Sequence, residues 1–113
     1  MTRTQLLQSI EETFKDAHSI VEAKNKDYAG KDGTSPFANF EFSSLIGQTV
    51  EESILGRVVD KIARIYSIVS SGETAVKSEA VSDTIRDCCN YLAIMKAYID
   101  SKKEQKQEKT TRP

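Results

Sequence analysis

The strongest constraint on the fold of this chain is a pair of helical apolar patterns joined by a short polar turn. Steps of three and four place side chains on one face of an α-helix, whereas a strand repeats every two residues. In the segment from about 77 to 102, such steps connect Val81, Ile85, Cys88, Leu92, Met95 and Ile99. In the segment from about 50 to 70, an apolar core stripe comprises Ile54, Leu55, Val58, Ile62, Ile65 and Val69. Because only "SSGETA" lies between them, we expect a long antiparallel helical hairpin.

An N-terminal helix is expected from about residue 3 to 26. Apolar residues recur there with helical spacing, and Thr2 with Gln5 matches a capping box, as Thr49 with Glu52 does before the 50–70 helix. Residues 28 to 48 contain three glycines and a proline, which break the pattern. Aromatic side chains in this loop favour an ordered segment, because they provide apolar anchors.

The expected fold class is therefore all-α, with the N-terminal helix packed across the hairpin. Residues 1–101 form one domain, and residues 102–113, which contain no apolar side chain, form a charged flexible tail. A single domain of 113 residues has a modest core, so further stabilisation by homo-oligomerisation is expected.

Composition limits the function classes. Sixteen basic and seventeen acidic residues give a net charge of -1, so we expect no binding of long nucleic acid. No apolar run approaches the roughly 20 residues of a membrane span, and the N-terminus lacks a secretory signal pattern, so we expect a cytoplasmic protein. The adjacent Cys88 and Cys89 are expected to be reduced packing residues, and His18, the only histidine, excludes a multi-histidine zinc site.

The hairpin also carries two polar stripes away from its apolar stripes. Like charges four residues apart on a helix repel each other, so the aligned acids of the second stripe need compensation. In an antiparallel hairpin that turns near residues 73 and 74, residue i lies level with about 147 minus i, which places the two stripes on one wall. The stripes comprise Arg57, Asp60, Lys61 and Arg64 on the 50–70 helix, and Glu79, Asp83, Asp87 and Asn90 on the 77–102 helix.

Two interpretations of this wall are open. In the first, both stripes are solvated and linked by surface ion pairs worth about 0–1 kcal/mol each. In the second, they line a site, because Ile94 and Ala97 continue the acidic side and are expected to be covered by another element or subunit. Converging carboxylates suit Mg²⁺ or Mn²⁺, and the neighbouring bases suit phosphates. The candidate metal ligands are Asp60, Asp83 and Asp87, and the candidate phosphate-binding residues are Arg57, Lys61 and Arg64.

Four segments together resemble a small phage and prophage domain associated with nucleotide metabolism. They are "KNKDYAG" (24–30), "PFANF" (36–40), "VDKIARI" (59–65) and "EAVSDTIRDCCNYLAI" (79–94). That domain is similar in layout to the MazG-like all-α nucleotide pyrophosphohydrolases. The resemblance implies an oligomeric nucleotide-binding protein in the cytoplasm of a phage-infected bacterium. MazG-type enzymes hold Mg²⁺ with acids spaced by three residues, whereas the acids of this chain are spaced by four.

For a nucleotide-binding protein or hydrolase, side-chain chemistry suggests roles for individual residues. Glu79 is the candidate catalytic residue, as a water-orienting base or a further ligand. The candidates for base binding, by stacking or hydrogen bonding, are Tyr28, Phe37, Asn39, Phe40 and Asn90. The leading hypothesis is a Mg²⁺-dependent nucleoside triphosphate pyrophosphohydrolase. The alternative is a non-catalytic protein that sequesters a nucleotide signal, such as a cyclic dinucleotide, to oppose host defence. A purely structural helical oligomer is the third.

Overall fold

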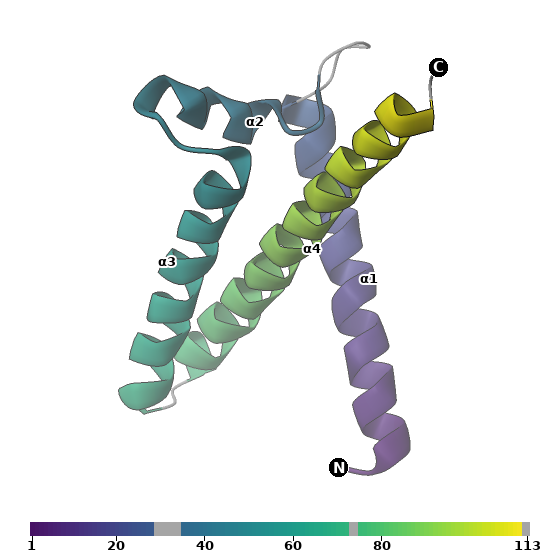
Figure 1. Ribbon diagram of the computed structural model, residues 1–113. Helices are drawn as coiled ribbons and strands as arrows, with labels where there is room; N and C mark the ends of the chain where they lie inside the picture. Colours follow the sequence, from purple (N-terminus) through teal and green to yellow (C-terminus); the bar gives the residue numbers. More distant parts are fainter. Residues whose placement is uncertain (29–34, 73–74, 112–113) are drawn as a thin grey trace.

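A computed structural model describes residues 1–28, 35–72 and 75–111, with their side chains at 1–25, 35–72 and 80–107. Within these ranges all regular structure is helical (Figure 1), which confirms the all-α prediction. Three long helices account for most of it, and two short segments precede the second of them. In chain order the elements are α1 (Arg3–Tyr28), α2 (Ala38–Glu41), the 3-10 helix η1 (Phe42–Ile46), α3 (Val50–Ser70) and α4 (Ala75–Thr111).

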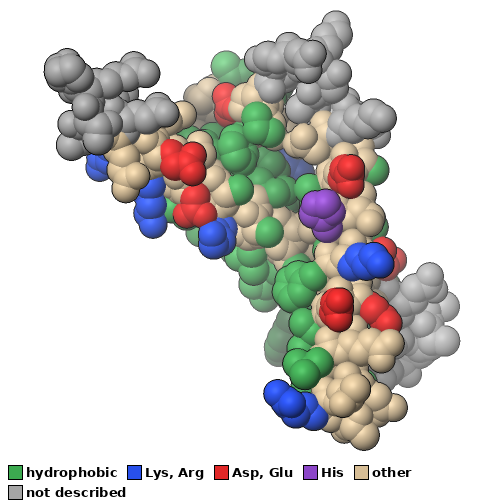
Figure 2. Space-filling view, turned by 90° about the vertical axis from the view of Figure 1, so that its right-hand side faces the viewer, with side chains coloured by type: hydrophobic (Ala, Val, Ile, Leu, Met, Phe, Trp, Pro, Cys, Tyr) green, Lys and Arg blue, Asp and Glu red, His purple; other side chains and the backbone are tan. Residues whose placement is uncertain are grey.

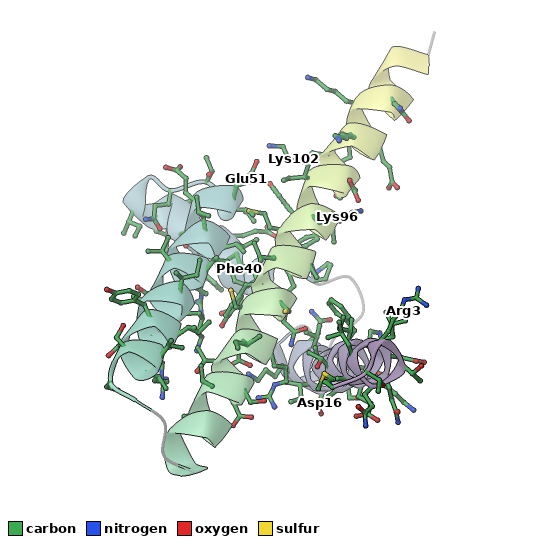
Figure 3. The ribbon with its side chains drawn as sticks, turned by 90° about the horizontal axis from the view of Figure 1, so that it is seen from below. Arg3, Asp16, Phe40, Glu51, Lys96 and Lys102 are labelled. Atoms are coloured by element: carbon green, nitrogen blue, oxygen red, sulfur yellow. The ribbon has the colours of Figure 1, made fainter. Side chains whose placement is uncertain are left out.

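Helices α3 and α4 pack as the predicted helical pair, converging toward the connection between them (Figure 1). Ile54 is fully buried on α3, and Cys88 is buried on α4. The Nζ atom of Lys61 lies 3.6 Å from a carboxylate oxygen of Asp87, one residue from the expected register. At the other end of the pair, Lys102 donates a 2.9 Å hydrogen bond to Glu51 across the gap between the helices (Figure 3).

Both predicted capping boxes are present. The amide of Gln5 donates to the Thr2 hydroxyl and the amide of Thr2 donates to the Gln5 side chain, at 3.1 and 2.9 Å. Thr49 and Glu52 exchange the same two bonds at the start of α3. Each box satisfies two backbone amides that the first helical turn leaves without partners, so the sequence fixes both helix starts.

Helix α1 lies across α4 and positions one wall of the molecule (Figure 1). Ala17 is buried at this crossing. Asp16 lies on the side of α1 that faces α4, whereas Arg3 points away from it (Figure 3). The N-terminal half of α1 extends beyond the crossing, so its apolar residues Leu6, Ile10 and Phe14 are exposed.

Only part of each predicted hairpin stripe is buried. On α3 the structure buries Ile54 and Val58, but Leu55, Ile62 and Val69 are exposed. On α4, Cys88 is buried, whereas the remaining seam positions are half-buried (Val81, Met95) or exposed (Ile85, Leu92, Ile99). The core assignment is confirmed for Ile54, Val58 and Cys88 and was wrong for the exposed residues. Each helix meets its partner with one flank, and nothing described in the chain covers the other flank.

The structure also changes two boundaries. Helix α4 continues to Thr111 instead of ending near residue 102, because Lys, Glu and Gln are good helix formers and no glycine or proline intervenes before Pro113. The flexibility assigned to residues 102–113 stays a prediction.

The predicted loop contains α2 and η1, and the buried Phe40 confirms its order within residues 35–48. Among the described residues, no helix combines the length and apolar character that a membrane crossing needs.

Candidate ligand-binding site

A cavity of about 420 Å³ opens where α1, α3, α4 and the segment before α2 meet. Val21 and Asn25 of α1 form one side, and Asn90 and Ile94 of α4 form another. The side-chain amide of Asn25 donates a 3.2 Å hydrogen bond to the carbonyl of Pro36, which ties the end of α1 to the third wall. Figure 2 shows hydrophobic side chains gathered where the α1 arm meets the rest of the molecule. The cover expected over the side of α4 that carries Ile94 is thus supplied, at least in part, by this chain itself.

Aromatic side chains give the cavity its character. Phe37, Phe40 and Tyr91 all line it. The rings of Phe40 and Tyr91 meet edge to face, with centroids 6.3 Å apart, and Phe37 makes the same kind of contact with Tyr98 at 5.1 Å. Edge-to-face pairs are favoured because the positive edge of one ring meets the negative face of the other. These contacts fix the aromatic walls, and Phe40 lies between α3 and α4 (Figure 3).

Arg57 of α3 brings a positive charge to the same walls. The carbon at the centre of its guanidinium group lies 5.3 Å from the Phe40 ring centroid and 5.9 Å from that of Tyr91. Both distances are within the range of a cation–π interaction. A planar cation held against two rings leaves its N–H groups available at the edge of the cavity, where they suit an anionic ligand.

A smaller groove of about 250 Å³ adjoins the cavity. Arg57 and Tyr91 line both, and the groove adds Asp60, Lys61 and Arg64 from successive turns of α3. Three cations surround one carboxylate here, so the groove has a local excess of positive charge although the whole chain is nearly neutral. An apolar, aromatic cavity therefore lies next to a basic groove, and Arg57 and Tyr91 line both.

The aligned acids of α4 are compensated by Arg86. One terminal nitrogen of this residue lies 3.4 Å from Asp83 and 3.5 Å from Asp16 of α1, and the other lies 3.6 Å from Asp87. Asp87, which lines the cavity, has Lys61 as a second cationic partner. Ion pairs thus join α1, α3 and α4 behind the cavity, and they offset the repulsion between acids four residues apart.

These pairings bear on the predicted metal site. Within the described part of the chain, no three acidic, histidine or cysteine side chains gather as potential metal ligands. Asp87 lines the cavity, Asp60 lines the groove, and Asp83 lies on the surface of α4 beside Arg86. Mg²⁺ prefers several carboxylate or water oxygens, and Asp87 is already held by two cations. The described side chains do not gather into a metal centre, and Mg²⁺ or Mn²⁺ binding stays a prediction.

The structure brings most of the other candidate residues together. Four predicted base-binding residues line the cavity, namely Phe37, Asn39, Phe40 and Asn90, and the three predicted phosphate-binding residues line the groove, namely Arg57, Lys61 and Arg64. The side chains of Tyr28 and Glu79 lie outside the described residues. The candidates on two distant segments, 37–40 and 57–64, therefore meet at one place on α4.

Sequence reasoning missed several residues of this region. Arg86 follows Asp83 by three residues, a spacing that was visible in the sequence as a helical ion pair. Tyr91 follows Asp87 by four residues, so its place on the same side of α4 was also predictable. Asp16 and Asn25 gave no such signal, because their roles depend on the angle at which α1 crosses α4.

The two cysteines have a packing role. Both are free, and burial raises the pKa of the Cys88 thiol, with a smaller contribution from neighbouring Cys89. A raised pKa keeps the thiol neutral and unreactive. This agrees with the role expected from the sequence.

No protein-family model matches the chain, and searches of curated proteins and of solved structures return no significant match. The resemblance to the MazG-like enzymes therefore stays a prediction. Any function is inferred from the geometry of the cavity and the groove.

Proposed function

We propose that this protein binds a nucleotide, with the base in the aromatic cavity and the phosphates over the basic groove. The observation that carries the proposal is that the two spaces lie side by side and share Arg57 and Tyr91 in their walls. A nucleotide has the same division into a flat, largely apolar end and an anionic end. The cavity volume falls in the range of about 300–1,000 Å³ that is usual for small-molecule sites.

Base recognition rests on the aromatic walls and the amides beside them. Stacking of a base on an aromatic side chain is worth about 1–3 kcal/mol and depends little on which base is bound. Asn39 and Asn90 line the same cavity, and an amide both donates and accepts hydrogen bonds, so it can meet the edge of a base. Stacking would then supply affinity, and the amides would select the base.

Phosphate recognition rests on Arg57, Lys61 and Arg64. Arginine donates two parallel hydrogen bonds to phosphate oxygens, and lysine adds a compact positive charge. Lys61 pairs with Asp87 at 3.6 Å, a distance longer than a strong charge-assisted hydrogen bond. This lysine can therefore turn toward a phosphate at little cost, while Arg86 continues to compensate Asp87.

Binding without hydrolysis is the form of the activity that the site supports best. Of the candidate metal ligands, Asp83 and Asp87 are paired with lysine or arginine, and Asp60 lines the groove and not the cavity. The protein then sequesters its nucleotide, as expected for a binder of a signal such as a cyclic dinucleotide. Mg²⁺-dependent pyrophosphohydrolysis is the competing activity in the test below.

The test is recovery of bound ligand. The protein is incubated with nucleoside triphosphates and cyclic dinucleotides in the presence of Mg²⁺. Free nucleotide is measured by chromatography after ultrafiltration, and again after the protein is denatured by heat. We expect depletion of at least one nucleotide and its recovery intact. Release of pyrophosphate would overturn sequestration in favour of hydrolysis, and absence of depletion across the panel would overturn nucleotide binding.

A matched pair of variants tests the assigned site. Arg57→Gln removes the shared cation, and we expect it to weaken binding by about tenfold or more, because hydrogen bonds to charged groups are worth about 1.5–3 kcal/mol. Arg3→Gln removes an exposed arginine at the far end of α1 and should leave the affinity unchanged. Equal affinities for the wild type and both variants would contradict the site.

A further inference from the structure

A second apolar stripe runs along α3 on the flank that α4 leaves uncovered. Its five residues follow one another in steps of four, three, four and three, which is the seven-residue repeat of helices that pack side by side. Each exposes about half of its surface or more. The stripe consists of Leu55 (49%), Val59 (56%), Ile62 (54%), Tyr66 (74%) and Val69 (65%).

Helix α4 continues this stripe into a broader face. Ile85, Leu92 and Ile99 recur every seven residues and expose 42, 45 and 37% of their surfaces. At 100° per residue, the α3 stripe lies on one flank of the buried Ile54 and Val58, and the basic groove lies on the opposite flank. The same rotation per residue, applied to α4, places the α4 stripe on the side of that helix opposite Asp87 and Asn90. Both stripes therefore share one side of the hairpin, away from the cavity, and we call it the back face.

The chain exposes more surface than a compact domain of its length does. The chain exposes 8865 Å², whereas a compact monomer of 113 residues exposes roughly 6,200 Å². Its radius of gyration is 17.3 Å, compared with about 13 Å for a compact domain of this length. One partner in a standard protein interface buries about 800 Å². The excess exposed area, which the back face shares with the N-terminal half of α1 and the end of α4, is larger than one partner's share of such an interface.

We propose that the back face packs against the back face of a second copy of this chain, in a four-helix arrangement built from α3 and α4 of each copy. A two-fold axis pairs a patch with itself, and an apolar stripe with a seven-residue repeat is complementary to its own copy run antiparallel. A net charge of -1 gives little repulsion between copies. Few side chains are buried within the described chain, so its own copy supplies the burial that the single chain lacks.

The axis of this dimer passes near Ile62, which is the middle residue of the α3 stripe. Antiparallel pairing then places Leu55 of one copy near the end of the stripe that carries Val69 in the other. The cavity and the groove lie on the opposite side of the hairpin, so both copies keep their sites open. The proposal is independent of the proposed function, because it concerns residues that line neither space.

Light scattering after size-exclusion chromatography measures the mass in solution. The full chain should have about twice the 12.6 kDa of one copy. The double variant Val59→Glu, Ile62→Glu should dissociate at least a hundredfold more readily. Leu45→Glu, Ile46→Glu is a matched control, because these residues of η1 are exposed at 83 and 76% but lie outside the back face. A monomeric wild type, or an unchanged mass for the back-face variant, would overturn the proposal.

Cross-linking keeps the proposal testable if the glutamate variant fails to fold. A disulfide joins two cysteines only when their Cα atoms lie within about 7 Å. Ile62→Cys should give a covalent dimer under mild oxidation on a non-reducing gel, whereas Leu45→Cys should not. Cross-linking of the Leu45 variant alone, or of neither variant, would overturn the back face as the dimer interface.

Discussion

The two sides of the α3–α4 hairpin differ in what the rest of the chain does with them. On one side, α1 and the segment around α2 help to line an aromatic cavity that adjoins a basic groove. On the other, eight large apolar side chains are left uncovered. The same two helices therefore supply an aromatic and basic side suited to a small ligand and an apolar, uncovered side suited to another helix pair.

The comparison is sharpest for two isoleucines on α3. Ile54 is fully buried between the two sides, and Ile62 lies on the back face. Ile54→Ala should lower the free energy of unfolding by about 2–5 kcal/mol, because it removes buried methyl groups and leaves a cavity. Urea unfolding measures this value. Ile62→Ala should cost less, and its cost should decrease on dilution, since the residue is covered only through association. If both variants lost the same free energy of unfolding at every protein concentration, the two isoleucines would not differ in how they are buried.

Two tyrosines separate the sides by function. Tyr91 lines both the cavity and the groove, whereas Tyr66 belongs to the back face. Tyr91→Leu should weaken nucleotide binding by roughly five- to 150-fold, because base stacking on an aromatic ring is worth about 1–3 kcal/mol. Tyr66→Leu makes the same chemical change and should leave affinity intact, as measured by calorimetric titration. If both variants bound equally well, Tyr91 would have no role in the site.

The smallest expected effect is on the pH dependence of folding stability, through two glutamates at the start of α3. The hydrogen bond from Lys102 lowers the pKa of Glu51 below its ordinary value of 4.5, and the backbone amide of Thr49 lowers that of Glu52. A carboxylate whose pKa is lowered in the folded state contributes its full stabilisation at pH values above the pKa that it has in the unfolded chain. That contribution is lost as the pH falls through the pKa of the group in the folded protein.

Urea unfolding between neutral pH and about pH 3 measures this loss. Glu51→Gln should flatten the acid limb of the stability profile slightly. Glu11→Gln, at an exposed position on α1, is the control and should leave that limb unchanged. An acid limb that is identical in the wild type and the Glu51 variant would show that the Glu51–Lys102 bond does not contribute.

Local rules account for what the sequence predicted well. The capping boxes at Thr2 and Thr49 depend on residues three apart, and the hairpin register depends on one short turn. That register placed Asp87 within one residue of its partner on α3. The aromatic residues of the loop are predicted to be apolar anchors. In the structure, Phe37 contacts Tyr98 of α4 and Phe40 contacts Tyr91 of α4. Spacing along the chain contains enough information for these features.

The missed features depend on angles and partners that spacing does not specify. A seven-residue apolar pattern shows that Leu55 and Ile62 lie on one side of a helix, but not whether their cover comes from this chain or another. The pairing of Arg86 with Asp16 depends on the crossing angle between α1 and α4. The end of α4 depends on helix propensity in a polar segment that an apolar pattern cannot mark.

The nucleotide site itself can be tested with the four phenylalanines of the chain. Phe37 and Phe40 line the cavity, whereas Phe14 and Phe42 are exposed outside it. Selective labelling of phenylalanine gives four amide signals in a nuclear magnetic resonance spectrum, which are assigned by single Phe→Leu variants. Titration with the nucleotide that the protein depletes should shift the signals of Phe37 and Phe40 and leave that of Phe14 in place. Binding with unchanged Phe37 and Phe40 signals would contradict a nucleotide site in this cavity.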